Sequence, residues 1–190
     1  MKKTYLLLLL VCFVNLKAFS QNQSKTTLGL APTLESNVGF FGPMLSLERQ
    51  EKLNSRINFV AGVSGFYANK VLDHVVAENE YNRTVIADLG FSFKLNKNKN
   101  ADLQLKAGLT SRFSKVRHLI SYNTDLATNT TQNLKYSKIT DENWGYVLGI
   151  AYDYKITKKH SLGIFSDARF IDIKSEPTFL NVGLRVGLLK

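Results

Sequence analysis

The side chains most able to carry chemistry, histidines with acids and hydroxyls, are scattered through this chain of 190 residues. Its three histidines, His74, His118 and His160, fall in separate predicted loops or turns. A metal site usually needs several His, Cys or carboxylate ligands at characteristic spacing. Three acids lie near His74 in the sequence: Asp73, Glu78 and Glu80. A solvated loop explains that group more simply than a weak cation site, so we expect no metal.

Two further arrangements suggest catalysis only weakly. His160 and Ser161 are adjacent, but they lie at a predicted turn between two strands. Asp125 and Glu142 lie in one long predicted loop and form no recognised motif. The chain contains neither a Gly-rich phosphate loop nor a nucleophile elbow. We therefore expect no enzymatic activity and no cofactor.

A different set of charged residues is more informative, because its members alternate with large apolar residues. They are Glu48, Asp88, Lys106, Arg112, Asp153, Asp167, Arg169 and Arg185. The two signs balance, and the residues between them on the same strand face are often Gly, Ser, Ala or Thr. Balanced charges among small residues suit the filled interior of a narrow barrel. We predict an ion-pair network there, in which Asp167 faces Arg185 or Arg169, and Asp88 faces Lys106 or Arg112. The alternative is a solvated outer face.

The strand that must position Asp153 shows the other face most clearly. Residues 143–155 read NWGYVLGIAYDYK, with every second residue large: Trp144, Tyr146, Leu148, Ile150, Tyr152 and Tyr154. Strict alternation predicts a β-strand with two different faces. Its order of two aromatics, two aliphatics and two aromatics matches the interfaces and hydrocarbon core of a membrane. Tilted by about 40°, the stretch spans roughly 25 Å, the height of the apolar band of an outer-membrane barrel.

Seven other segments show the same alternation, and none shows a helical period. The eight predicted strands are residues 28–34, 41–48, 57–67, 85–95, 103–113, 143–155, 162–170 and 180–189. The second, fourth and sixth connections are short, whereas the third and fifth, residues 68–80 and 118–142, are long. Outer-membrane barrels have an even strand number, short periplasmic turns and longer external loops. The pattern predicts an all-β, eight-stranded, antiparallel up-and-down transmembrane β-barrel.

The amino terminus has the features of an export signal. Two lysines precede an apolar run from Tyr5 to Val14, and Ala18 and Ser20 suit a signal peptidase. We expect residues 1–20 to be removed and residues 21–190 to form the barrel domain. Removal lowers the formal charge from +10 to +7 and takes away Cys12, the single cysteine. An exported basic chain is expected to attract lipopolysaccharide or the membrane surface and not nucleic acid.

In its export signal, eight amphipathic strands and aromatic bands, the chain resembles the small outer-membrane β-barrel proteins of the OmpA/OmpX and PorT-like type. The resemblance covers residues 25–190 and is one of pattern. Two features depart from it: the chain ends Leu188-Leu189-Lys190 where the family usually has an aromatic residue, and Pro32 and Pro43 fall inside strands. In a closed ladder, either the prolines lie at bulges near the outer rim or the first strand is shorter than residues 28–34.

Three functions remain open at this point. The first is a monomeric, non-enzymatic outer-membrane barrel with a structural or adhesive role, whose loops 68–80 and 118–142 contact a protein or glycan. The second is a barrel enzyme acting on lipopolysaccharide or surface peptides. The third is a soluble periplasmic calycin-like binder, which would bury Leu148 and Ile150 and leave Asp167 and Arg185 in water.

Overall fold

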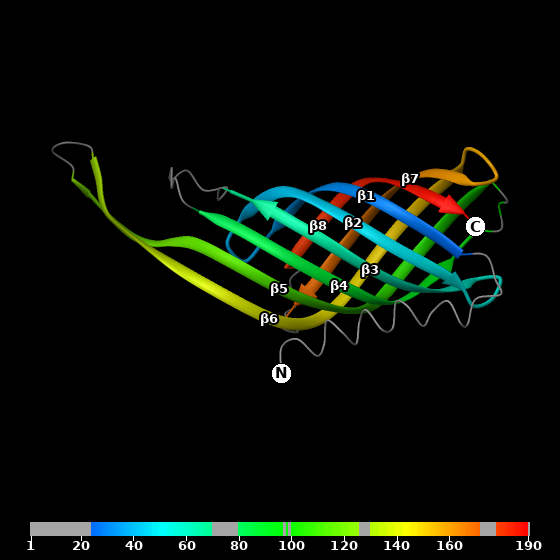
Figure 1. Cartoon of the computed structure of the whole chain (residues 1–190), viewed down its shortest axis with the longest axis horizontal. Coiled ribbons are helices and arrows are strands. Elements are labelled where there is room, and N and C mark those ends of the chain that lie inside the picture. Colours follow the sequence, from blue (N-terminus) through cyan, green and yellow to red (C-terminus); the bar gives the residue numbers. More distant parts are fainter. Residues whose placement is uncertain are drawn as a thin grey trace.

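Eight antiparallel strands form one closed barrel (Figure 1). The computed structural model describes residues 24–69, 80–96, 98, 100–125, 130–171 and 178–189. The strands are β1 (Ser24–Glu35), β2 (Phe40–Lys52), β3 (Ile57–Ala68), β4 (Tyr81–Lys94), β5 (Ala101–Asp125), β6 (Thr130–Lys155), β7 (His160–Ile171) and β8 (Phe179–Leu189). Among the described residues, no helix is long and apolar enough to cross a membrane. The expected cleavage site lies outside the described residues.

Each strand pairs with its neighbours in the sequence, and β1 pairs with β8 to close the ring. The start of β1 and the end of β8 lie at one end of the barrel, which we call the terminal end (Figure 1). The opposite end is called the outer end. The β1–β2 turn lies there, where Gly39 has a φ of 77° and donates to the Glu35 carbonyl at 3.1 Å. A residue with a side chain would be strained at that φ, so glycine suits this turn.

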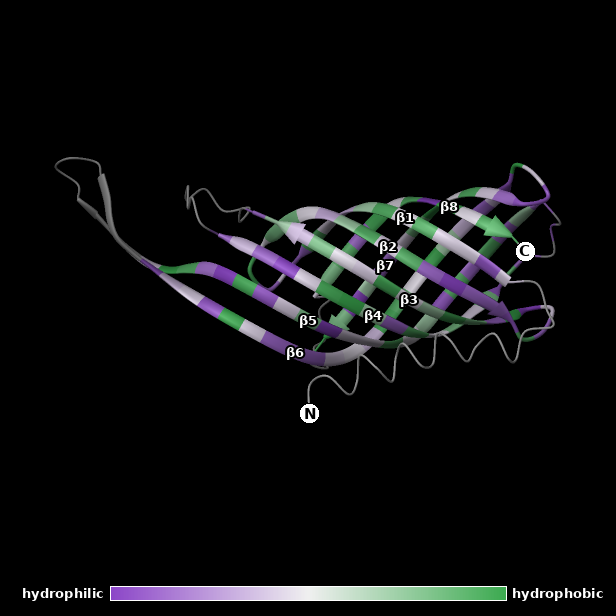
Figure 2. Ribbon diagram, in the orientation of Figure 1, coloured by the Kyte–Doolittle hydropathy of each residue, from purple (hydrophilic) through white to green (hydrophobic). Residues whose placement is uncertain are grey.

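Alternate residues of the strands point into and out of the barrel. In β7, for example, buried and exposed or half-buried residues alternate from His160 to Ile171. Hydrophobic and hydrophilic residues alternate along most strands in Figure 2. The fold therefore divides the side chains into an inner set and an outer set, as strand geometry requires.

The predicted loop 118–142 is wrong, because this segment is mostly strand. β5 runs on to Asp125 and β6 begins at Thr130, so the two strands pair as a hairpin far beyond the rest of the barrel (Figure 1). β4 pairs with β5 only up to Arg117, and β7 pairs with β6 only from Gly145. The error arose because the apolar and polar residues do not alternate in this segment, whose backbone is nevertheless extended.

Several strand ends also differ from the prediction. β1 begins four residues earlier and includes Glu35, and β2 continues to Lys52. Polar residues extend each strand past its apolar part, where the period-two signal fades. The predicted loop 68–80 agrees with the ends of β3 and β4, although residues 70–79 lie outside the described part of the chain.

Pro32 and Pro43 lie directly opposite each other on β1 and β2, and no register shift occurs at this pair. The prediction of bulges there is wrong. Instead, the β1–β8 ladder is interrupted at Ala31 and Pro32, and the β2–β3 ladder begins at Met44, just after Pro43. A missing proline N–H is tolerated in each strand because pairing on one side stops at that point.

Toward the outer end, the interior contains an apolar cluster. Its buried members are Phe40, Met44, Phe66, Ala68, Ile86, Ile171 and Phe179. Phe66 and Phe179 pack edge to face, with ring centroids 5.5 Å apart. This apolar plug, as we call these seven residues, fills the lumen next to its polar middle.

Candidate functional site

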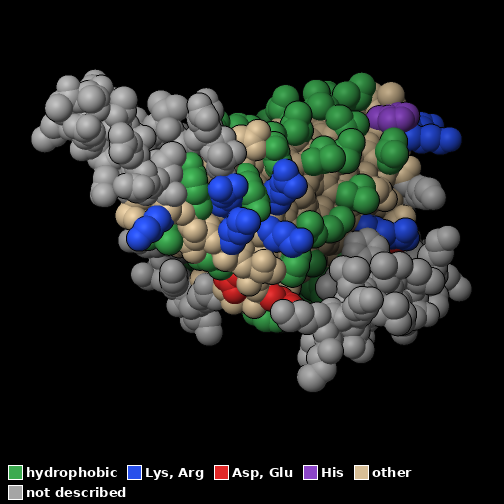
Figure 3. All heavy atoms as spheres, turned by 60° about the vertical axis from the view of Figure 1, so that its left-hand side comes forward, with side chains coloured by type: hydrophobic (Ala, Val, Ile, Leu, Met, Phe, Trp, Pro, Cys, Tyr) green, Lys and Arg blue, Asp and Glu red, His purple; other side chains and the backbone are tan. Residues whose placement is uncertain are grey.

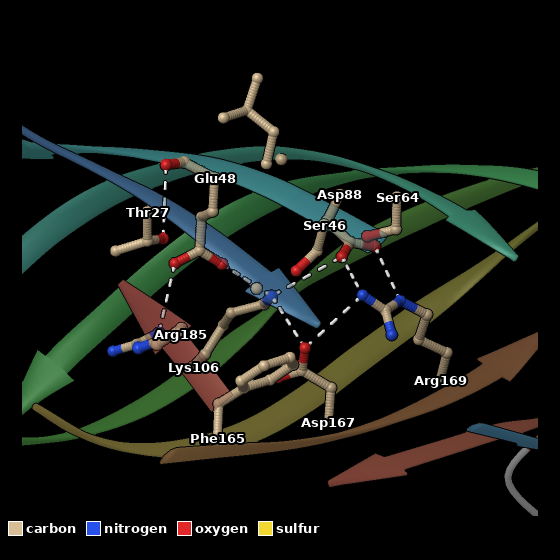
Figure 4. Close-up of a pocket in the computed structure, with 13 residues that line it drawn as sticks. Thr27, Ser46, Glu48, Ser64, Asp88, Lys106, Phe165, Asp167, Arg169 and Arg185 are labelled. Atoms are coloured by element: carbon tan, nitrogen blue, oxygen red, sulfur yellow. Dashed lines mark hydrogen bonds and ion pairs between the residues drawn. The ribbon is translucent and has the colours of Figure 1, made fainter. Parts of the chain in front are cut away.

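The middle of the lumen is organised around the ammonium group of Lys106 on β5. Its Nζ lies 2.9 Å from Glu48 Oε2, 3.5 Å from Asp167 Oδ2 and 3.6 Å from Asp88 Oδ2. These carboxylates come from β2, β7 and β4, so one cation joins strands on different sides of the ring (Figure 4). A charge in so confined a space is stable only when it is paired, and here it has three partners.

Arg169 on β7 extends the network toward the outer end. Its guanidinium donates to both oxygens of Asp88, at 2.7 and 3.3 Å, and lies 3.5 Å from Asp167. Thr110 also donates to Asp88, at 2.7 Å. On its other side Arg169 contacts the Met44 sulfur at 3.8 Å, where the apolar plug begins. This arginine is among the most deeply buried side chains of the described residues.

Arg185 on β8 extends the network toward the terminal end. Its guanidinium donates through two nitrogens to the Asp153 carboxylate and lies 3.7 Å from Glu48. Lys25 of β1 donates to Asp153 at 2.6 Å. The connected set, called the lumen network below, contains four cations and four carboxylates. Its members are Lys25, Glu48, Asp88, Lys106, Asp153, Asp167, Arg169 and Arg185.

Two glycines make room for these carboxylates. A Cβ at Gly149 would collide with Asp167 Oδ1, and a Cβ at Gly163 would collide with Asp153 Oδ1. Gly149 lies directly opposite Asp167, and Gly163 lies directly opposite Asp153. The missing side chain on one strand is therefore the space that the carboxylate of the next strand occupies.

Little space remains among these side chains. The cavity beside the lumen network has a volume of about 20 Å³, room for one or two water molecules. A wider polar hollow of about 140 Å³ opens at the terminal end, lined by Lys52, Lys94 and Gln104 among others. The network and the apolar plug lie between this hollow and the outer end, so the lumen is filled.

Seven of the eight residues predicted for the interior network lie in it, and Arg112 does not. Arg112 is buried in the lumen but donates to Asp141 at 2.8 Å, nearer the outer end. Sequence reasoning missed Lys25 because strand one was drawn from Leu28; continuing the alternation back through Thr27 would have found it. Asp141 is not among the predicted residues because it falls in the predicted loop 118–142.

The outer face of the barrel has the opposite character. Exposed large hydrophobic side chains occur on all eight strands, among them Leu30, Leu45, Val63, Val85, Leu109, Leu148, Ile164 and Leu184. Leu148 and Ile150 are 49% and 47% exposed, whereas Asp167 and Arg185 are only 7% and 6% exposed. A soluble binder requires the reverse, so this polarity excludes the calycin-like alternative. Soluble monomers rarely carry a continuous apolar surface of this extent.

The aromatic residues of β6 lie on this apolar face. Trp144, Tyr152 and Tyr154 are exposed, and Tyr146 is half-buried. The Tyr146 ring stacks on Phe170 of β7, with centroids 4.6 Å apart and planes 10° from parallel. Trp144 and Tyr154 thus lie at opposite ends of one exposed aliphatic stretch.

The candidates for catalysis do not converge among the described residues. His160 is the first residue of β7, and its Nδ1 lies 3.0 Å from Thr157 Oγ1 within an exposed turn. His118 lies on β5 near the outer end, opposite Ser137, and its Nδ1 has no hydrogen-bond partner. Along β6, Glu142 lies twelve residues from Thr130, the partner of Asp125, which corresponds to roughly 40 Å. His74 lies outside the described residues.

Comparisons with known proteins agree on the architecture. No family model and no curated protein matches the chain. Among solved structures, Ail of Yersinia pestis superposes with a TM-score of 0.58 at 10% identity, covering 90% of this chain and 100% of Ail. The fold is that of a small outer-membrane barrel. This barrel fold also matches Neisserial surface protein A, with a TM-score of 0.55 at 12% identity. That match covers 88% of this chain and 94% of the Neisserial protein. It matches the N-terminal β-barrel domain of Pseudomonas aeruginosa OprF as well, with a TM-score of 0.51 at 13% identity. That match covers 90% of this chain and 98% of the OprF domain.

Proposed function

We propose that this chain is an integral outer-membrane barrel without enzymatic activity that presents its β5–β6 hairpin as an interaction surface. The observation that carries the proposal is the inverted polarity: a ring of exposed apolar side chains surrounds a filled, charge-balanced lumen. Such a ring is stable where lipid covers it. The expected export signal at residues 1–20 supports delivery across the inner membrane, with both ends of the barrel domain in the periplasm.

The hairpin supports the second half of the proposal. From residue 118 onward β5 pairs only with β6, and β6 up to Trp144 pairs only with β5. Each described strand of the hairpin therefore has one edge whose backbone groups lie outside the sheet ladder. Such an edge can accept a partner strand. Among the proteins that share the fold, Ail is named an attachment invasion locus protein. A protein or glycan outside the cell is the proposed partner.

The experiment is expression of the full-length chain in a diderm host, followed by membrane fractionation and protease treatment of intact cells. The expected result is recovery with the outer membrane, a gel mobility that changes on heating, and cleavage confined to the hairpin and outer loops. Recovery in the soluble periplasm contradicts the membrane location. Complete protection of the hairpin in intact cells contradicts its exposure.

A further inference from the structure

Four cations gather on the outward face where β4, β5 and β6 approach the outer end. They are Arg83, Lys115, Arg117 and Lys138, and we call them the rim cluster. Arg83 lies directly opposite Lys115, and Arg117 directly opposite Lys138. Directly opposite side chains have Cβ atoms about 5 Å apart, and like charges so placed repel each other. Figure 3 shows a group of Lys and Arg side chains beside the hydrophobic surface.

The four cations of the rim cluster outnumber the carboxylates beside them in the described part of the chain. None of its four side chains is in a salt bridge there, in contrast to the lumen network. Glu142 is exposed on the same face, opposite Phe113, and leaves a net charge of +3. The rim cluster therefore keeps a net positive charge that an anion from outside the chain would neutralise.

Aromatic rings hold the two arginines in place. The Arg83 guanidinium lies 5.1 Å from the centre of the Tyr81 ring and 5.6 Å from that of Tyr67. The Arg117 guanidinium lies 4.3 Å above the Tyr136 ring, and Arg117 Nε is buried without a hydrogen-bond partner. Groups already held in one position lose less entropy when they bind an anion.

The position of the rim cluster indicates which class of anion it can reach. Along β4 and β5, the next outward residues toward the barrel middle are Val85 and Phe113, which are 51% and 43% exposed. The rim cluster thus begins at the next outward-facing residue on the outer side of the exposed apolar surface. Its side chains point away from the barrel axis. If the barrel is placed in a membrane as proposed, these side chains point at the headgroups of the outer leaflet.

We propose that the rim cluster binds the phosphate groups of an anionic, lipid A-type glycolipid of the outer leaflet. This inference rests on the proposed membrane placement. Arginine pairs with phosphate through two parallel hydrogen bonds, and lysine adds a compact positive charge. Two phosphates on one glycolipid would bridge the Arg83–Lys115 pair and the Arg117–Lys138 pair.

The test uses the folded full-domain barrel in neutral detergent, titrated with diphosphoryl lipid A and followed by native mass spectrometry. The variant Arg83→Gln/Lys115→Gln/Arg117→Gln/Lys138→Gln is expected to bind more than tenfold more weakly than wild type. A control removes four exposed cations at the terminal end, Lys52, Arg56, Lys158 and Lys159, and is expected to bind within twofold of wild type. Monophosphoryl lipid A is expected to bind wild type several-fold more weakly than the diphosphoryl form.

If the fourfold variant does not fold, Lys115→Gln/Lys138→Gln keeps all three arginine–tyrosine contacts and is expected to bind at least fivefold more weakly. Equal lipid A binding by wild type and the folded rim variant overturns the inference, as does an equal loss in the control. Dextran sulfate serves as a soluble polyanion. If it binds through the rim cluster while lipid A does not, the lipid assignment is wrong. If wild type also fails to insert into phosphatidylcholine vesicles, the proposed function fails as well; if it inserts but ignores lipid A, only this inference fails.

Discussion

At the scale of single residues, Lys106 should matter more than any exposed lysine, because three carboxylates share its charge. Replacing it with Met leaves Glu48, Asp88 and Asp167 with one counter-charge fewer. We expect Lys106→Met to lower the free energy of unfolding by about 3–5 kcal/mol. Urea unfolding in phosphatidylcholine vesicles, followed by heat-dependent gel mobility, measures this. Lys158→Met, in an exposed turn, is the matched control and should change the value by less than about 0.5 kcal/mol.

Asp167→Asn offers a second check on the same network. It removes one negative charge near Lys106, so adding it to Lys106→Met should recover part of the lost stability. Strict additivity of the two losses would mean that the two side chains are not coupled.

Gly149 and Gly65 provide a matched pair of glycines. A methyl group at Gly149 collides with the Asp167 carboxylate, whereas one at Gly65 has no atom within 4 Å. We expect Gly149→Ala to destabilise the barrel by about 1–3 kcal/mol and Gly65→Ala to have an effect within about 0.5 kcal/mol. The same urea titration compares them, and equal effects would contradict the close packing around Asp167.

The inward direction of the charged residues could be predicted from the sequence, but most of their partners could not. Period-two alternation places Asp88 and Arg169 on the inner face whatever the tilt of the barrel. Which residues then meet across the lumen depends on the stagger between strands, which alternation does not contain. For this reason the sequence predicts Arg112 in the central network, whereas its partner in the structure is Asp141.

At the scale of elements, the β5–β6 hairpin should be separable from the barrel. Beyond residue 118 its two described strands form ladder pairs only with each other, and the Leu119 N–H donates to Glu80 Oε1 at 2.6 Å. Replacing residues 120–135 with Asn-Gly, which closes a two-residue hairpin between Leu119 and Tyr136, should leave the free energy of unfolding within about 1 kcal/mol of wild type. A much larger loss would show that the hairpin supports the barrel. Loss of binding to cells or glycans by this variant would locate the proposed interaction.

The hairpin also marks the limit of sequence interpretation. Within the apolar band, one face of each strand must be apolar, so the alternation of apolar and polar residues predicts the strand. Above the band neither face of β5 or β6 has to be apolar, and Thr and Asn suggest a loop by composition alone. The strand count survived this error because each long segment still connects two correctly predicted strands.

At the scale of the whole molecule, the proposed membrane placement predicts that the stability lost on introducing an outward-facing charge depends on the depth of that residue in the bilayer. Leu148 lies in the middle of the apolar band, and Ile156 lies in the turn after β6. In phosphatidylcholine vesicles, Leu148→Arg should lower the free energy of unfolding by about 2–4 kcal/mol and Ile156→Arg by about 0–1 kcal/mol. The difference should shrink in small detergent micelles, which adapt to a charge. Equal costs in vesicles would place the band outside the lipid.

The filled lumen predicts that the barrel does not conduct ions. Between the terminal hollow and the outer end lie the lumen network and the apolar plug. Wild-type barrel in a planar lipid bilayer should therefore show no steady current. Stable single-channel steps at wild-type protein would contradict the closed arrangement of Lys106 and Arg169.

The interruption between β1 and β8 has a consequence for the order in which the barrel assembles. Every other strand pair is a hairpin, but this one joins Thr27 to Gly187 across 160 positions of the chain. Bringing such distant segments together costs about 4–5 kcal/mol of free energy, because the chain between them loses conformational entropy. On the outer side of the gap at Ala31 and Pro32, three pairs from Thr33 to Glu35 and the hydrogen bond from Ser36 N–H to the Thr178 carbonyl join the two segments. We therefore predict that the ring closes last during folding. Hydrogen exchange of the folded barrel should show the amide protons along the outer part of this junction exchanging before those of the other strand pairs.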